Sequence, residues 1–245
     1  MGKSHGDRSI NIGGNVDGSA IVVGDGNTVS RQTSHQISRQ TSNQASIETS
    51  SVPSTAPSKR KLLILAASPQ GSSRLRLDEE VREISEGLKR AAQRDAFEIA
   101  QRWAVRPRDF QRARLEERPQ IVHFSGQHKG AVGLHFETET GGAQRVDASA
   151  LAALFKLFSL KAKTDCVVLS RCYAPDQAAA IAQYVPYVVG MMQSMDDSAA
   201  IEFVVGFYDA LGNGESVAFA FESGKVAMAL NASDCAEMPV LLSND

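Results

Sequence analysis

Residues 62–67 read LLILAA, an apolar run with no polar residue to mark a solvent-facing side. A half-exposed strand alternates apolar and polar residues, whereas a parallel strand covered on both faces reads as a continuous apolar run. A Ser/Pro/Gly loop follows, and apolar residues then recur at helical spacing, namely Leu77, Val81, Ile84 and Leu88. This strand–loop–helix order predicts an α/β fold built on a buried parallel sheet.

The same alternation continues toward the C-terminus. Further strands are expected at 97–105, 121–125, 166–169 and 187–192, with a hairpin around residues 140–142. Helices are expected at 108–117, 151–158, 177–185, 203–211 and 217–230, the last one interrupted near Gly224. Strands that alternate with helices predict a mainly parallel sheet with helices on both faces.

The first 60 residues have a different composition. Residues 1–29 are rich in Gly and Asn and contain the short apolar run AIVV at 20–23. Residues 30–60 form a Ser/Gln/Thr tract in which SRQTS occurs at 30–34 and again at 38–42. With almost no large apolar side chains, this tract cannot offset the entropy cost of ordering. We therefore expect a candidate signalling segment at 1–29, a disordered linker at 30–60 and a folded domain at 61–245.

Composition narrows the function classes. A formal net charge of -2 does not favour a nucleic acid or an anionic membrane as partner, and no apolar run reaches 18 residues. Three cysteines without disulfide spacing indicate a reducing compartment, and the N-terminus has no apolar leader, so a cytoplasmic protein is expected. The five histidines lack metal-ligand spacing, and we predict neither a metal nor a cofactor.

Two expected strands are followed, at their carboxyl ends, by residues that could take part in catalysis. Open α/β sheets have their functional crevice at this end of the strands. The strand at 121–125 runs into His128, and the strand at 166–169 runs into Cys172. If the strands are neighbours, the two residues lie across one strand spacing, roughly 5 Å. An imidazole beside a thiol favours the thiolate and can protonate a leaving amine. Backbone N–H groups near Gly126 and at Cys172 would then hold an oxyanion.

Several segments, in the same order along the chain, resemble the CHAT domain, a caspase-like cysteine peptidase family of the caspase and separase clan. They are IVHFSG at 121–126, VVLSRCY at 167–173, VVGM at 188–191, DSAAIEF at 197–203 and GFY at 206–208. The resemblance implies a caspase-like three-layer sandwich, with a catalytic His after the third strand and a catalytic Cys after the fourth. Cys172 matches the position of the nucleophile.

The chain departs from the family pattern at two places. CHAT domains usually read His-Phe-Ser-Gly-His-Gly, whereas residues 123–130 read HFSGQHKG. Either one residue is inserted and His128 is the base, which is our prediction, or Gln127 occupies the catalytic position and the domain is a degenerate adaptor or scaffold. The family's Asn-Ala-Cys is altered to Ser-Arg-Cys, with Ser170 where relatives that cleave after basic residues carry an acid. The sequence therefore predicts no cleavage preference.

The resemblance leads to a prediction of function. We expect a cysteine endopeptidase that cleaves protein substrates as an effector of a bacterial conflict or defence system. Residues 10–29 resemble Gly/Asn/Val amyloid-type signalling segments, which implies an upstream sensor as partner. A third reading is a flavodoxin-like nucleotide binder, because the Gly/Ser loop at 68–74 precedes a helix N-terminus, although it lacks P-loop spacing.

The remaining polar residues and cysteines are expected to have structural roles. His123 is expected to be hydrogen-bonded inside a strand, Cys166 to lie in the core and Cys235 to be incidental. Glu80 is read with its acidic neighbours as a partner of the helix dipole, and Arg171 as part of a solvated face.

Overall fold

The computed structural model describes residues 59–70, 76–126, 133–171, 174–193, 195–231 and 233–244. The chain divides into two units, residues 1–52 and 53–245, and every described residue belongs to the second. The expected segment at 1–29 and all but the end of the expected linker at 30–60 lie outside the described residues.

The main sheet has the strand order β2-β1-β3-β6-β7-β8. Its strands are β1 (Arg60–Ala67), β2 (Phe97–Trp103), β3 (Ile121–Gly126), β6 (Cys166–Ser170), β7 (Tyr187–Met191) and β8 (Pro239–Ser243). The first five in spatial order pair in parallel, and β8 pairs antiparallel with β7. A separate antiparallel hairpin consists of β4 (His135–Glu137) and β5 (Ala143–Arg145). The predicted α/β class with a mainly parallel sheet is confirmed.

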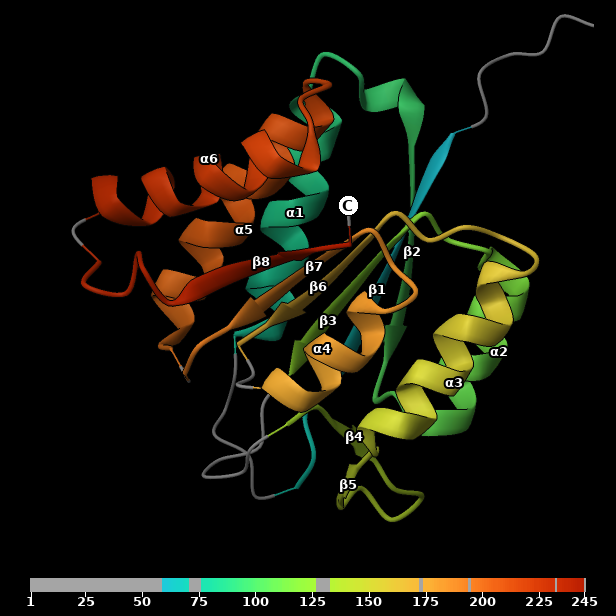
Figure 1. The fold of residues 1–245 in the computed structure, drawn as a ribbon. Coiled ribbons are helices and arrows are strands. Elements are labelled where there is room, and N and C mark those ends of the chain that lie inside the picture. Colours follow the sequence, from blue (N-terminus) through green and yellow to red (C-terminus); the bar gives the residue numbers. More distant parts are fainter. Residues whose placement is uncertain are drawn as a thin grey trace, which may run out of the picture. The chain divides into compact units, whose positions relative to one another are not determined.

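Helices cover both faces of the sheet, which gives three layers (Figure 1). One face carries α1 (Leu77–Arg90), α5 (Asp197–Gly212) and α6 (Val217–Leu230). The other carries α2 (Pro107–Glu117), α3 (Ala148–Ser159) and α4 (Pro175–Ala182), and a short 3-10 turn at Arg94–Ala96 precedes β2. Among the described residues, no helix combines the length and the apolar character that crossing a membrane requires.

The apolar run that opens the domain explains this layering. Leu62 and Ile64 pack into the core beneath α1, α5 and α6, while Leu63 and Leu65 pack into the core beneath α2, α3 and α4. Side chains alternate across a strand, so a strand with a core on each side needs apolar residues at every position. Burial of each such side chain contributes about 1.5–3 kcal/mol.

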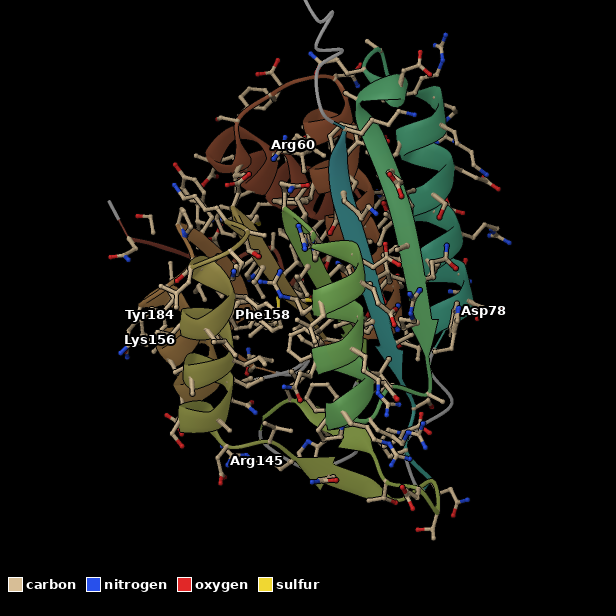
Figure 2. All side chains as sticks on the ribbon, turned by 90° about the vertical axis from the view of Figure 1, so that its right-hand side faces the viewer. Arg60, Asp78, Arg145, Lys156, Phe158 and Tyr184 are labelled. Atoms are coloured by element: carbon tan, nitrogen blue, oxygen red, sulfur yellow. The ribbon has the colours of Figure 1, made fainter. Side chains whose placement is uncertain are left out.

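The carboxyl ends of the central strands meet at one edge of the sheet. Ala67 of β1 lies opposite Gly126 of β3, and Ser125 of β3 lies opposite Ser170 of β6. Figure 2 shows Arg60, at the start of β1, and Arg145, in the hairpin, toward opposite ends of the described domain. The hairpin therefore lies at the end to which the parallel strands point.

Two features differ from the sequence prediction. Helix α6 is continuous through Gly224, because this glycine allows a close approach between α5 and α6 rather than a break. Strand β8 was not predicted, because its five residues form a short antiparallel edge strand that lacks the strand–helix alternation of the rest. Cys235, which precedes β8, is half-buried against the core.

The close approach of α5 and α6 gives a stability prediction. A Cβ at Gly224 would lie 2.8 Å from both the ring and the carbonyl oxygen of Phe203. We expect Gly224→Ala to lower the melting temperature, since overpacking costs about 1–3 kcal/mol and exceeds the gain of about 1 kcal/mol in helix propensity.

Gly87→Ala is the matched control, measured in the same thermal melt. Gly87 is also buried within a helix, but the first atom a Cβ there would meet is the carboxylate end of the Asp209 side chain, which can rotate away. This variant should retain or gain stability. Equal losses in the two variants would contradict the packing argument.

Candidate active site

The two strands that precede the predicted catalytic residues are neighbours, which meets the condition for the predicted pairing of His128 and Cys172. β3 and β6 are adjacent and parallel, with Ser125 paired to Ser170. Cys172 and His128, and also Gln127, lie outside the described residues, so their predicted pairing stays a prediction. Gly126 is buried at the end of β3, where a Cβ would collide with the backbone carbonyl oxygen of Ala67 in β1. Its expected role in an oxyanion hole stays a prediction.

A buried carboxylate lies beneath this edge. Glu80, in the first turn of α1, is fully buried, and its side chain meets polar groups from two strands. One oxygen, Oε1, lies 3.1 Å from His123 Nε2 and accepts a hydrogen bond of 2.6 Å from Ser170 Oγ. The other oxygen, Oε2, accepts a hydrogen bond from Ser125 Oγ. His123 and Ser125 are two residues apart in β3 and therefore face the same helix layer.

His123 has a structural role, as the sequence predicted. Its Nδ1 lies 3.1 Å from the hydroxyl of Tyr208 in α5, and its ring is fully buried. Burial raises the pKa of Tyr208 well above its ordinary value, so this hydroxyl stays protonated. Nε2 donates a hydrogen bond to the Glu80 carboxylate. The imidazole is fully engaged on both nitrogens.

Arg171 completes the buried network, and its assignment to a solvated face was wrong. The residue directly precedes Cys172 and is fully buried. Its Nε lies 2.9 Å from Glu80 Oε2, and its Nη1 donates a hydrogen bond of 2.7 Å to Asp197 Oδ1 at the start of α5. Asp197 also accepts a hydrogen bond of 3.2 Å from the backbone N–H of Arg76, just before α1. Arg171, which follows the C-terminal end of β6, thus contacts both α1 and α5.

The network keeps Glu80 ionised. Burial by itself would raise the pKa of this carboxyl, but the hydrogen bond and charge of His123, the charge of Arg171 and the hydrogen bond from Ser125 lower the pKa to about 2. At neutral pH the group is a carboxylate that accepts hydrogen bonds and balances the guanidinium. It is therefore a counter-ion and not a general acid or base.

A second buried polar side chain connects the segments that follow the two expected catalytic residues. Gln177, in α4, is fully buried; its Oε1 accepts from the backbone N–H of Leu134, and its Nε2 donates to Val146 O at 2.6 Å. Leu134 follows His128 by six residues, and Gln177 follows Cys172 by five. The Gln177 side chain therefore links α4, which follows Cys172, to the residues that follow His128.

The loop after β1 is fastened to the hairpin. The N–H of Ser68 donates to Glu137 Oε1 at 2.9 Å, and the N–H of Gln70 donates to Gly141 O at 2.7 Å. Residues 71–75 lie outside the described residues. Two N–H groups of the loop that could have cradled a phosphate already have partners, which counts against the nucleotide-binding reading.

A groove of about 520 Å³ lies at the same end of the sheet, between α2, the end of β2 and the hairpin. Its lining includes Trp103, whose side chain is half-exposed, and Arg112. The other charged residues there are largely paired, as in the ion pairs Arg102–Glu116 and Arg106–Asp109. The groove offers an apolar ring and a cation at the edge that carries the predicted chemistry.

Sequence reasoning missed Glu80, Arg171 and Gln177, although one signal was present. Glu80 is three residues after Leu77 and four before Ile84, so the helical spacing itself places this acid on the apolar face of α1. A charged residue at a core position needs a buried partner. No comparable periodicity marks Arg171 or Gln177.

The ionised state of Glu80 gives a pH-dependent prediction. Its folded pKa lies below the value of 4.5 for an unperturbed glutamate, so the stabilisation is present above that value and is lost as the pH falls toward about 2. We expect Glu80→Gln to lower the unfolding free energy by about 3–5 kcal/mol at pH 7, because Arg171 loses a buried counter-ion. The deficit should shrink as the pH falls from 5 to 3, measured by urea unfolding.

Glu79→Gln is the control for this prediction. Glu79 precedes Glu80 in the chain, but its side chain is partly exposed and pairs with Arg76 at the surface, so its loss should cost under about 1 kcal/mol. A deficit in Glu80→Gln as small as that of Glu79→Gln, or one that persists unchanged at pH 3, would refute the assignment.

Comparison with known proteins shows which family the chain resembles. Residues 20–237 match the CHAT domain family. A protein named Roc-COR-CHAT protease, from an unknown prokaryotic organism, is 25% identical over 198 residues, which are 76% of this chain and 19% of that protein. A probable protease of Gillisia limnaea (strain DSM 15749 / LMG 21470 / R-8282) is 24% identical over 155 residues, 63% of this chain and 27% of that protein.

The chain therefore spans only about a fifth to a quarter of the length of the curated relatives it matches. Among solved structures, a secreted C11 cysteine protease from Bacteroides thetaiotaomicron superposes with a TM-score of 0.54 at 12% identity, over 76% of this chain and 66% of that chain. At this identity the likeness concerns the fold, and it confirms the predicted caspase-like architecture. Because the family match extends over most of the chain, this protein belongs to the CHAT domain family.

Proposed function

We propose that this chain is a cysteine endopeptidase in which Cys172 is the nucleophile and His128 the general base and then acid. The observation that carries the proposal is the parallel pairing of β3 and β6, with Ser125 opposite Ser170, which brings the carboxyl ends of the two strands to one edge of the sheet. The protease names of the two relatives and the fold of the C11 protease support the same activity.

The proposed reaction begins when His128 takes the thiol proton of Cys172 and the thiolate attacks a peptide carbonyl. The backbone N–H groups at Gly126 and Cys172 would stabilise the oxyanion. His128 then donates its proton to the leaving amine, and water hydrolyses the thioester. The groove beside Trp103 and Arg112 lies at the same end of the sheet, where an extended polypeptide substrate could bind.

The alternative function is a degenerate CHAT adaptor or scaffold, which is favoured by Gln127 at the place where the family carries its catalytic His. A neutral amide does not take a proton from a thiol, so the two readings differ in the reactivity of Cys172.

The two readings are separated by the rate at which iodoacetamide alkylates Cys172, measured across pH with site mapping by mass spectrometry. With a His128 dyad, the pH midpoint should lie below the value of about 8.5 for a free thiol and return to it in His128→Ala. Gln127→His should change little. If Gln127 instead occupies the catalytic position, Gln127→His alone should lower the midpoint, and His128→Ala should have no effect.

Two other cysteines serve as internal controls. Cys166 is fully buried, which raises its pKa to about 12, so it should stay unlabelled while the protein is folded. Cys235 is half-buried, and its labelling should be unaffected by either substitution. A Cys172 that behaves as an ordinary thiol in wild type, in His128→Ala and in Gln127→His would reject both forms of the dyad.

We further propose that the peptidase acts in a bacterial conflict or defence system and is recruited through residues 10–29. Support comes from the short β-branched runs between Gly and Asn residues, which could add to an in-register stack formed by an upstream sensor. The Ser/Gln/Thr tract at 30–60 would act as a flexible tether.

Recruitment can be tested with fibres of a synthetic peptide covering residues 10–29. The full chain should co-sediment with these fibres, and a chain lacking residues 1–29 should stay in the supernatant while Cys172 keeps its alkylation rate. Equal sedimentation of both chains would argue against recruitment through this segment.

A further inference from the structure

We propose that Arg171 is a positioning residue that fixes the backbone directly before Cys172, a role that rests on the proposed function of Cys172 as nucleophile. Arg171 is the last described residue before Cys172. It combines full burial, a left-handed backbone and ion pairs to acids on two helices.

The backbone of Arg171 has a φ of 67°. A left-handed conformation costs a residue with a side chain roughly 1–2 kcal/mol and persists only where surrounding contacts enforce it. Among the described residues, Ala104 and Arg118 also have a positive φ, and Arg118 follows the C-terminus of α2, where this conformation is common. Arg171, like Ala104, follows a strand, so its conformation needs a cause other than a helix C-terminus.

The side chain of Arg171 supplies that cause. Its guanidinium pairs with Glu80 from α1 at 2.9 Å and with Asp197 from α5 at 2.7 Å, so the last turn of chain before Cys172 is held from two directions. Both acids are anchored in turn. Glu80 accepts from the serines and is bonded to His123, and Asp197 accepts from the backbone of Arg76. Rotation of the Arg171 backbone would pull the guanidinium from both partners.

Stability alone is a poor explanation for this arrangement. Replacing a buried ion pair by apolar residues of similar volume is often neutral or stabilising, because desolvation offsets the Coulomb attraction. The cost is increased here because Arg171 Nη2 has no hydrogen-bond partner among the described residues, and Nε, although it forms an ion pair with Glu80 Oε2 at 2.9 Å, lacks hydrogen-bond geometry. A network that contributes little stability and ends beside the proposed nucleophile is suited to fix the backbone conformation at that point.

The substitutions Arg171→Met and Arg171→Gly test this role in the full chain. Methionine keeps an unbranched apolar stem but removes the charge, whereas glycine accepts the left-handed backbone without strain but removes the side chain. We expect both variants to slow alkylation of Cys172 by at least about tenfold at pH 7 and to shift its pH midpoint toward that of a free thiol, about 8.5. Hydrogen exchange of the 166–175 segment should rise in both.

Arg114→Met is the matched control. Arg114 is also a fully buried arginine with an unpartnered Nε, but it contacts Pro119 and Thr164 before the starts of β3 and β6, at the opposite edge of the sheet. Its ring contacts with Phe155 and Phe158 should make its loss destabilising. The melting temperature should fall while the midpoint for Cys172 and exchange in 166–175 stay at wild-type values.

The double variant Glu80→Gln/Arg171→Met provides a check on folding. Because it removes the buried carboxylate together with the buried guanidinium and leaves only the partly exposed Asp197 without this ion pair, it should recover melting temperature relative to Arg171→Met. It should not recover the alkylation of Cys172, because the anchor remains absent.

Three outcomes would overturn the inference. The first is a pH midpoint for alkylation of Cys172 in Arg171→Gly that equals the wild-type midpoint. The second is hydrogen exchange of the 166–175 segment that is unchanged in both Arg171 variants. The third is an effect of Arg114→Met on Cys172 as large as that of the Arg171 variants. The exchange measurement does not depend on catalysis. It therefore decides on the positioning role even if an ordinary, His128-independent thiol at Cys172 were to reject the proposed function.

Discussion

The buried carboxylate of Glu80 is the constraint on which the functional edge of this domain depends. Removing such a charge from water costs several kcal/mol, which must be offset by donors that reach it in the right geometry. The donors are His123, Ser125 and Ser170 of β3 and β6, and Arg171, which follows β6, adds an ion pair. Helix α1 therefore cannot slide or rotate against the sheet without breaking several charge-assisted contacts at once.

The same constraint separates two kinds of polar residue at the carboxyl ends of the strands. The groups that face α1 are buried and bonded to one another, and Glu80 among them is held as a carboxylate, so this layer is closed to a substrate. The residues that continue the two strands carry the proposed chemistry. A rigid layer beneath a reactive one is what an active site needs, since catalytic groups must be held within fractions of an ångström by residues that do not themselves move.

The parts of the fold that depend on apolar periodicity could be predicted from sequence. The run at 62–67 indicated a strand with a core on each side, and the alternation of strands and helices predicted a mainly parallel sheet with helices on both faces, whereas the adjacency of β3 and β6 came from the structure. The prediction failed for charges, because a lone Arg or Glu is usually solvated, and only tertiary structure brings Arg171, Glu80 and Asp197 together. It also failed at Gly224, where a close helix contact, not a break, requires glycine.

The altered motif before Cys172 bears on the choice between enzyme and scaffold. Where the family has Asn-Ala-Cys, this chain has an arginine whose charge is buried, and that change is tolerable only because Glu80 and Asp197 oppose it. Introduced alone, the arginine would leave an uncompensated buried charge that costs several kcal/mol. A scaffold would keep its fold equally well with an apolar residue there. A compensated and costly network that ends at Cys172 is easier to understand if the position of that thiol matters, which favours the peptidase.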